Sequence, residues 1–513
     1  MVKGLGKKNK MSASDRKNIR REKSDDSFVF VRSVDVLATS LAGDTSSNTR
    51  NTEANKEDIQ NQQVSPISQR TEPLTLQNFQ KFIDTDGRLV DESLLRRTVF
   101  LGGVEPNARR EVWQYLFALY PCSSTRRERE VLLLDYIVKY NEMKSRWKTL
   151  LVLSAKPGAT KFEQGLVARY QLENPQNGLQ SPTLETSDPL ANVENLSINV
   201  EAAQADSMES DFNALSKNCK FLDFNSEETK QKIEFMKIQS QVYVNRCKID
   251  VTGMKNYLRL IDKDVPRTDR DVPYFKESTS NQLSMLRDIL ITYATFHPDI
   301  GYAQGMNDIL ARFLYVFDSE VEAFWCFNNY LEKIKEDFLE VGMINKIELV
   351  RKLLLEMDSP LLEHLQRHDL GDLLFCHRWL LLGFKREFSF MDSLRVFEIL
   401  SSHHLELSSI EAETAKRKQA MKEFVRQGGV TRTEPIDTEA EYTFELFMCV
   451  ALLETCRDKL FRCYDAAMVF ECINNLEINL DSILEQSEQL FFRYCKKTVE
   501  NSFQIVDTPL VRR

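Results

Sequence analysis

Apolar residues recur at helical spacing along most of the chain after residue 72. Leu283, Leu286, Leu290 and Tyr293, for example, follow one another by three or four residues, which is the spacing of one face of an amphipathic helix. Alternation typical of a strand is scarce, and residues 28–34 (FVFVRSV) are the one tempting case. The pattern predicts an all-α protein built around a single large helical domain.

Polar stretches interrupt the helical pattern and set the predicted domain layout. We expect a disordered N-terminal tail over residues 1–72, which is rich in polar side chains, and a short C-terminal tail over residues 501–513. The helical domain between them, residues 73–500, should contain a disordered insertion over about 155–225 and a loop over about 406–438. The insertion is polar and aperiodic, so it lacks an apolar face with which to pack.

Composition and charge narrow the class of protein. The chain is 42% hydrophobic and has 31 Phe, enough for a sizeable core, while its net charge of -9 argues against a nucleic-acid partner. Ten cysteines without a Cys-x-x-Cys pair are typical of reduced thiols in the cytosol. No segment offers the roughly 18 apolar residues that a membrane span needs. We therefore expect a cytoplasmic protein whose contact with endomembranes, if any, is peripheral.

The N-terminal residues are strongly basic. Residues 1–23 carry nine Lys and Arg side chains against Asp15 and Glu22. A solvated tail is the simpler interpretation, and peripheral contact with an anionic membrane or a nuclear-import signal is the alternative.

Common cofactor motifs are missing from the sequence. His364 and His368 are spaced as two ligands on one helix face, but no third ligand accompanies them, so we expect surface histidines and no metal site. No Gly-x-x-x-x-Gly-Lys loop is present either. The chain therefore gives no sign of a nucleotide site of its own.

The stretch IDKDVPRTDRD, residues 261–271, concentrates charge around Pro266. We expect the preceding helix, residues 254–260, to end before this proline, because proline disfavours a continuing helix. Arg267 should then lie on a turn from which its side chain can project outward. On charge count alone, an ordinary surface cluster of ion pairs is the simpler interpretation.

The stretch GYAQGMND, residues 301–308, combines two glycines and several polar side chains directly before an apolar run. We expect the next helix to begin at Tyr302, with Gln304 in its first turn and pointing past the helix end. Gly305 removes a side chain beside it and permits close approach of another segment. Considered alone, the stretch slightly favours a simpler interpretation, in which Gly301 caps the helix and Gly305 provides packing space.

Together, the two stretches place an arginine and a glutamine at helix ends of one domain. GTP hydrolysis uses these two side chains, a guanidinium to neutralise charge on the transferred group and an amide to orient the attacking water. An arginine supplied to a partner's site can raise the rate by about 10³ to 10⁵. A surface ion pair contributes about 0 to 1 kcal/mol of stability, so chemistry explains an outward-facing Arg267 better.

Four motifs of the sequence resemble those of the TBC family of Rab GTPase-activating proteins, in the family's order. Residues 261–269 resemble the Ile-x-x-Asp-x-x-Arg motif, and residues 301–306 resemble the Tyr-x-Gln-Gly-Met motif. Arg109 and Trp113 resemble the opening Arg-x-x-x-Trp motif, and residues 375–388 (FCHRWLLLGFKREF) resemble a later helix of the family. The sequences of these motifs are most similar to those of the subgroup of TBC1 domain family members 15, 16, 17 and 25.

The resemblance implies an all-helical domain that supplies two catalytic side chains to a GTP-loaded Rab, the arginine finger Arg267 and the glutamine finger Gln304. The cofactors, GTP and Mg²⁺, would be held by the partner GTPase and none by this chain. The resemblance also implies a set of supporting residues, which seat the two fingers or hold the first helix against the core: Ile261, Asp264, Thr268, Tyr302, Gly305, Met306, Arg109 and Trp113.

A second function stays open at this point. A non-catalytic scaffold or effector could bind a Rab without accelerating hydrolysis. A weaker third possibility is an adaptor anchored to lipid by residues 1–23. Neither the choice of Rab nor the target membrane can be deduced from the residues quoted.

Overall fold

The computed structural model describes residues 70–153, 208–213, 215–217, 219–276, 281–408, 441–476 and 478–504. The chain divides into two units, Met1–Pro66 and Ile67–Arg513, and all described residues belong to the second. The basic stretch 1–23, the strand candidate 28–34 and most of the expected insertion lie outside the described residues.

The prediction of an all-α fold is confirmed. The helices of the described residues are α2 (Leu76–Phe79), α3 (Glu92–Gly102), α4 (Arg109–Leu116), α5 (Arg126–Leu153), α8 (Glu227–Arg246), α9 (Val251–Asp264), α10 (Asn281–Phe296), α11 (Met306–Phe317), α12 (Glu320–Ile334), α13 (Glu340–Met357), α14 (Ser359–Arg367), α15 (His377–Leu382), α16 (Phe390–Ser401), α18 (Phe444–Thr455), α19 (Arg457–Leu460), α20 (Ala466–Asn474) and α21 (Leu480–Gln504). Short 3₁₀ turns are η1 (Gln80–Phe82), η2 (Val265–Arg267), η3 (Pro273–Phe275), η4 (Lys335–Phe338) and η5 (Leu374–Cys376).

One short strand pair was not predicted. Strand β1 (Glu406–Ser408) pairs antiparallel with β2 (Glu441–Thr443), with Leu407 opposite Tyr442. The pair joins the two ends of a segment that lies outside the described residues, 409–440. Three-residue strands are too short for an alternating pattern to stand out in the sequence.

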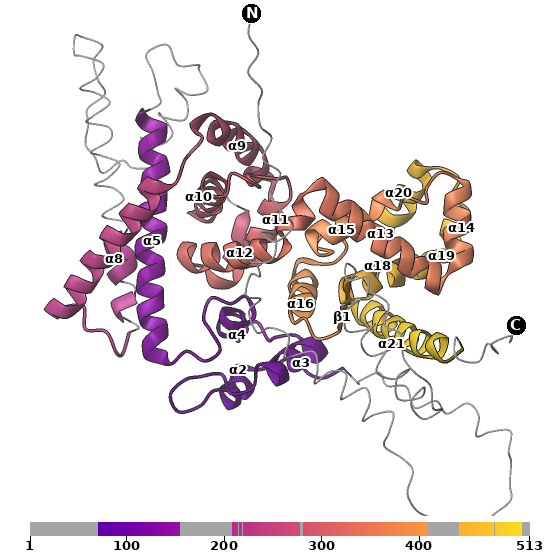
Figure 1. The fold of residues 1–513 in the computed structure, drawn as a ribbon, viewed down its shortest axis with the longest axis horizontal. Coiled ribbons are helices and arrows are strands. Elements are labelled where there is room, and N and C mark those ends of the chain that lie inside the picture. The colour runs from indigo at the N-terminus through magenta and orange to yellow at the C-terminus, as the bar shows by residue number, and fades with distance from the viewer. Residues whose placement is uncertain are drawn as a thin grey trace, which may run out of the picture. The chain divides into compact units, whose positions relative to one another are not determined.

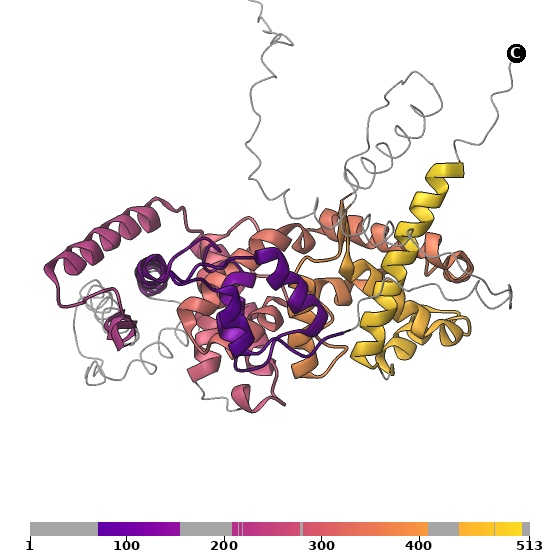
Figure 2. The same ribbon diagram turned by 90° about the horizontal axis from the view of Figure 1, so that it is seen from below.

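Two long helices pack side by side at one end of the unit. Figure 1 shows α8 running beside α5, and Figure 2 shows the same pair with α5 seen end-on. The last residues of the expected insertion also pack here: Met208 and Leu215 are buried, and Glu130 of α5 accepts hydrogen bonds from the backbone N–H groups of residues 220–222. These residues therefore pack against the domain, because their apolar side chains are buried there and the Glu130 carboxylate accepts hydrogen bonds from their backbone.

The core around the first helices is built on aromatic rings. Trp113 of α4 is fully buried and contacts Phe313 and Phe317 of α11 and Phe397 of α16, with ring centroids 5.7, 6.4 and 5.7 Å away. Edge-on aromatic pairs of this kind each contribute about 0.5 to 1.5 kcal/mol beyond their burial. The packing fixes α11, which begins at Met306, two residues after Gln304.

A buried carboxylate joins α4 to α16. Glu398 is completely buried and accepts hydrogen bonds from Arg109 Nε at 2.6 Å, Trp113 Nε1 at 3.0 Å and the Val104 N–H at 3.0 Å. Both residues of the Arg-x-x-x-Trp motif therefore meet on one side chain from the far half of the domain. No sequence motif identified Glu398 as this partner.

Replacing Glu398 with glutamine should lower the free energy of unfolding by about 1.5 to 3 kcal/mol, because the buried Arg109 then loses its charged acceptor. Urea unfolding followed by circular dichroism measures the change. The matched control is Glu363→Gln, whose pair with Arg367 on α14 is exposed on both sides and contributes about 0 to 1 kcal/mol. Equal shifts for the two variants would contradict the anchoring role of Glu398.

The apolar run 373–384 does not form a single continuous helix: Leu373, Gly383 and Phe384 adopt positive φ, so the run splits into η5, α15 and a tight turn. The expectation for one of the two histidines is wrong. His364 is not a surface histidine, because α14 packs it inward, where its Nε2 lies 3.1 Å from the carbonyl oxygen of Cys463. Within the described ranges, no helix has both the length and the apolar composition needed to cross a membrane.

Candidate functional site

The arginine turn, residues 265–269, follows the C-terminus of α9. Helix α9 continues to Asp264, past the expected end at residue 260, because Pro266 removes only its own N–H and restrains only the residue before it. The chain then makes the 3₁₀ turn η2, which begins at Val265 and contains Pro266. The Thr268 N–H closes this turn on the carbonyl oxygen of Val265 at 3.1 Å. As expected, Arg267 lies on a turn beyond a helix end.

Arg267 projects outward from this turn on a buried anchor. Its side chain is 57% exposed, whereas the side chain of Asp264, with which it forms an ion pair, is only 8% exposed. Ile261, one helical turn before Asp264, is fully buried. The guanidinium is therefore fixed at its inner edge and free to contact a partner at its outer edge.

The glutamine turn, residues 301–305, precedes α11 and is not part of it. The expected helix start at Tyr302 is wrong, since α11 begins at Met306. The two glycines explain the delay: Gly301 and Gly305 have φ of 65° and 106°, left-handed values that glycine adopts freely and other residues avoid. Gln304 is consequently exposed on the turn itself.

The φ values favour glycine at both ends of the glutamine turn, and both glycines are also closely packed against side chains. A Cβ atom on Gly305 would lie 2.8 Å from Cδ2 of Leu382, and one on Gly301 would lie 2.3 Å from the hydroxyl of Tyr257. Met306 is fully buried, and its sulfur accepts a hydrogen bond from the Ala303 N–H at 3.4 Å. The turn is therefore held by its own hydrogen bond to Met306 and by packing against Leu382 and Tyr257.

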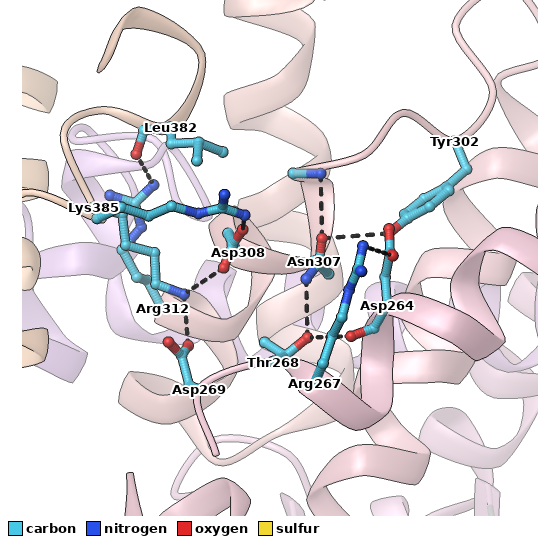
Figure 3. A network of polar contacts seen from close by, with 12 residues as sticks. Asp264, Arg267, Thr268, Asp269, Tyr302, Asn307, Asp308, Arg312, Leu382 and Lys385 are labelled. Atoms are coloured by element: carbon cyan, nitrogen blue, oxygen red, sulfur yellow. Dashed lines mark hydrogen bonds and ion pairs between the residues drawn. The ribbon is translucent and has the colours of Figure 1, made fainter. Parts of the chain in front are cut away.

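A buried hydrogen-bond network joins the two turns (Figure 3). The Tyr302 hydroxyl donates to Asp264 Oδ2 at 2.8 Å, so Asp264 holds Arg267 with one carboxylate oxygen and Tyr302 with the other. Thr268 donates to the backbone carbonyl of Asp264 at 3.0 Å and accepts from Asn307 Nδ2 at 2.9 Å. Asn307 in turn accepts from the Gly305 N–H at 3.2 Å. Any displacement of one turn is thus transmitted to the other.

Asn307 is the member of this network that the sequence did not identify. It is almost fully buried and satisfies a donor on the glutamine turn and an acceptor on the arginine turn. The signal was present, because an amide in the first turn of an otherwise apolar helix must find hydrogen-bond partners when it is buried. The partner itself, Thr268, could not be deduced from the spacing.

Burial shapes the acid–base state of the network. It raises the pKa of the Tyr302 hydroxyl far above its usual range, and the hydrogen bond to Asp264 raises it further. Tyr302 therefore remains protonated and donates to Asp264 at any physiological pH.

Known proteins with a similar sequence share this region. The family model of the Rab-GTPase-TBC domain matches residues 213–417, a range that contains Arg267 and Gln304. The chain is 28% identical to TBC1 domain family member 17 of Mus musculus, covering 65% of this chain and 38% of that protein. It is 27% identical to the GTPase-activating protein GYP7 of Candida glabrata, covering 66% and 36%.

A solved structure, that of the Ypt/Rab-GAP domain of Gyp1p, superposes with a TM-score of 0.44 at 16% identity, covering 82% of this chain and 98% of that one. The present chain spans well under half the length of TBC1 domain family member 17 and of GYP7.

Proposed function

We propose that the region matched by the family model of the Rab-GTPase-TBC domain, residues 213–417, makes this chain a GTPase-activating protein for a Rab-family small GTPase. The observation that carries the proposal is the pair of exposed side chains, Arg267 and Gln304, on two turns that one buried network holds together. The similarity to a protein described as GTPase-activating supports the same function.

In this proposal the two exposed side chains complete the active site of the partner. Arg267 donates from its guanidinium to the phosphate oxygens on which negative charge develops. The amide of Gln304 accepts from and donates to the attacking water and so orients it. The nucleotide and its Mg²⁺ belong to the GTPase, in agreement with the missing phosphate-binding loop in this sequence.

A panel of purified Rab proteins loaded with GTP tests the proposal by single-turnover hydrolysis, with and without this protein. We expect at least one Rab to hydrolyse GTP much faster in its presence. A Rab that binds the protein and keeps its intrinsic rate would instead identify a scaffold or effector. That result across a complete panel would overturn the proposal.

Peripheral contact of residues 1–23 with anionic endomembranes is a separate part of the proposal. It is supported by the nine basic side chains of this stretch alone. Deletion of residues 1–23 should then abolish binding to liposomes that contain phosphatidylserine. Unchanged binding after the deletion would remove this part and leave the activity untouched.

A further inference from the structure

We propose that Lys385 is a positioning residue for the activity proposed above, on which this inference rests. Lys385 lies in the turn between α15 and α16, distant in sequence from both fingers. Its ammonium group bridges one carboxylate beside the arginine turn and one carboxylate beside the glutamine turn. In this role it never touches the Rab or the nucleotide, and it acts by holding the two fingers at a fixed separation.

The bridge rests on two short contacts of a buried lysine (Figure 3). Lys385 Nζ lies 2.5 Å from Asp269 Oδ2 and 3.2 Å from Asp308 Oδ1. Its side chain is only 4% exposed. Asp269 is two residues beyond Arg267, and Asp308 is in the first turn of α11, four residues beyond Gln304. One ammonium group therefore connects the chain on both sides of the site.

The arginine turn needs such a restraint. Asp269 has φ of 45°, a left-handed conformation that is uncommon outside glycine, although Asp adopts it more readily than most residues. The Asp269 side chain forms an ion pair with Lys385. The carbonyl oxygen of Asp269 accepts a hydrogen bond at 2.9 Å from the Val272 N–H, which closes the turn. Loss of the lysine should let this turn relax and carry Arg267 with it.

The carboxylate on the other side is held in its charged form. Burial alone would raise the pKa of Asp308, but Lys385 and then Arg386 outweigh it, and the pKa lies below its usual value. Arg386 Nη2 binds Asp308 Oδ2 at 3.0 Å from the solvent side. The bridge from Lys385 to Asp308 therefore persists at neutral pH.

The same short segment also presses on the glutamine turn. Cδ2 of Leu382 faces the Cα hydrogen of Gly305, where even a Cβ would not fit. The carbonyl oxygen of Leu382 accepts a hydrogen bond at 2.9 Å from the fully buried Arg312 of α11. Residues 382–385 thus contact both turns and α11. This arrangement is expected of a segment that sets the distance between the two fingers.

The test replaces Lys385 with methionine, which keeps the length and removes the charge. Displacing catalytic groups by about 1 Å can cost about 10²-fold in rate, so we expect kcat for the stimulated Rab to fall about ten- to a hundredfold. The KM for the Rab should change little, because Lys385 is buried away from the partner. Asp269→Asn, which weakens only the arginine side of the bridge, should lower kcat in the same direction.

A double-mutant cycle separates positioning from a general loss of stability. If Lys385 acts through Arg267, adding Lys385→Met to Arg267→Ala should lower kcat much less than Lys385→Met does alone. The matched control is Lys144→Met, because Lys144 is similarly buried and also bridges two carboxylates, Asp288 at 3.1 Å and Glu320 at 2.6 Å. That variant should lose stability and keep kcat.

Hydrogen exchange decides the inference without any Rab. In Lys385→Met, the amides of residues 267–272 and 301–308 should exchange faster than in the wild type, and the amides of α5 should not. If the wild type accelerates no Rab, the proposed function fails and this exchange pattern still tests the restraint. Unchanged exchange at both turns, or an additive cycle with Arg267→Ala, would overturn the role of Lys385.

Discussion

Replacing Arg267 with alanine is expected to reduce stimulated GTP hydrolysis by at least about 10²-fold, because an arginine supplied to a partner's site contributes about 10³ to 10⁵ in rate. The fold should be retained, since the Arg267 side chain is more than half exposed and the buried Asp264 keeps its hydrogen bond from the Tyr302 hydroxyl. Single-turnover hydrolysis at saturating protein measures the rate, and thermal unfolding checks the fold.

Two further variants define what Arg267 contributes. Arg267→Lys keeps the charge but loses the planar fork of donors, so it should also be much slower than the wild type. Lys263→Ala removes an exposed cation on the last turn of α9 and should hydrolyse close to the wild-type rate. Full activity of Arg267→Ala on a Rab that the wild type stimulates would refute the arginine mechanism.

The helices could be predicted from the sequence because their signal is local. Apolar spacing predicted α10. The start of α16 is determined just as locally, because Ser389 accepts a hydrogen bond from the Asp392 N–H three residues further on. The helix ends were less predictable. The end of α9 depends on how far the helix continues before Pro266, and the start of α11 depends on Gly305, which packs against Leu382 from a distant part of the chain.

Arg267, Gln304 and the residues that seat them within the two motifs were predicted from the sequence, whereas the residues that reach the two turns from elsewhere in the chain were not. Arg267 and Gln304 stand in short motifs with unusual composition. Asn307, Lys385 and Glu398 reach partners far along the chain, and Asp269 and Lys385 are 116 residues apart. Local spacing carries no information about such pairs, because they form only when the helices pack.

Gln304 differs from Arg267 in having no hydrogen-bond partner among the described residues. It is exposed on the glutamine turn, whose shape is set by Gly301, Gly305 and Asn307. A long polar side chain on a turn that is held so closely contributes little to folding. Its removal should therefore report on catalysis alone.

Gln304→Ala is expected to lower stimulated hydrolysis by about 10²-fold or more, because the attacking water loses the amide that orients it. Single-turnover hydrolysis should show this loss while binding of the GTP-loaded Rab is retained. A Rab whose own water-orienting glutamine is replaced by alanine sharpens the test. If Gln304 supplies the amide, the wild-type protein still accelerates that Rab and Gln304→Ala does not. Acceleration that survives Gln304→Ala and vanishes with the altered Rab would place the water under the control of the GTPase, and Arg267 would be the sole finger.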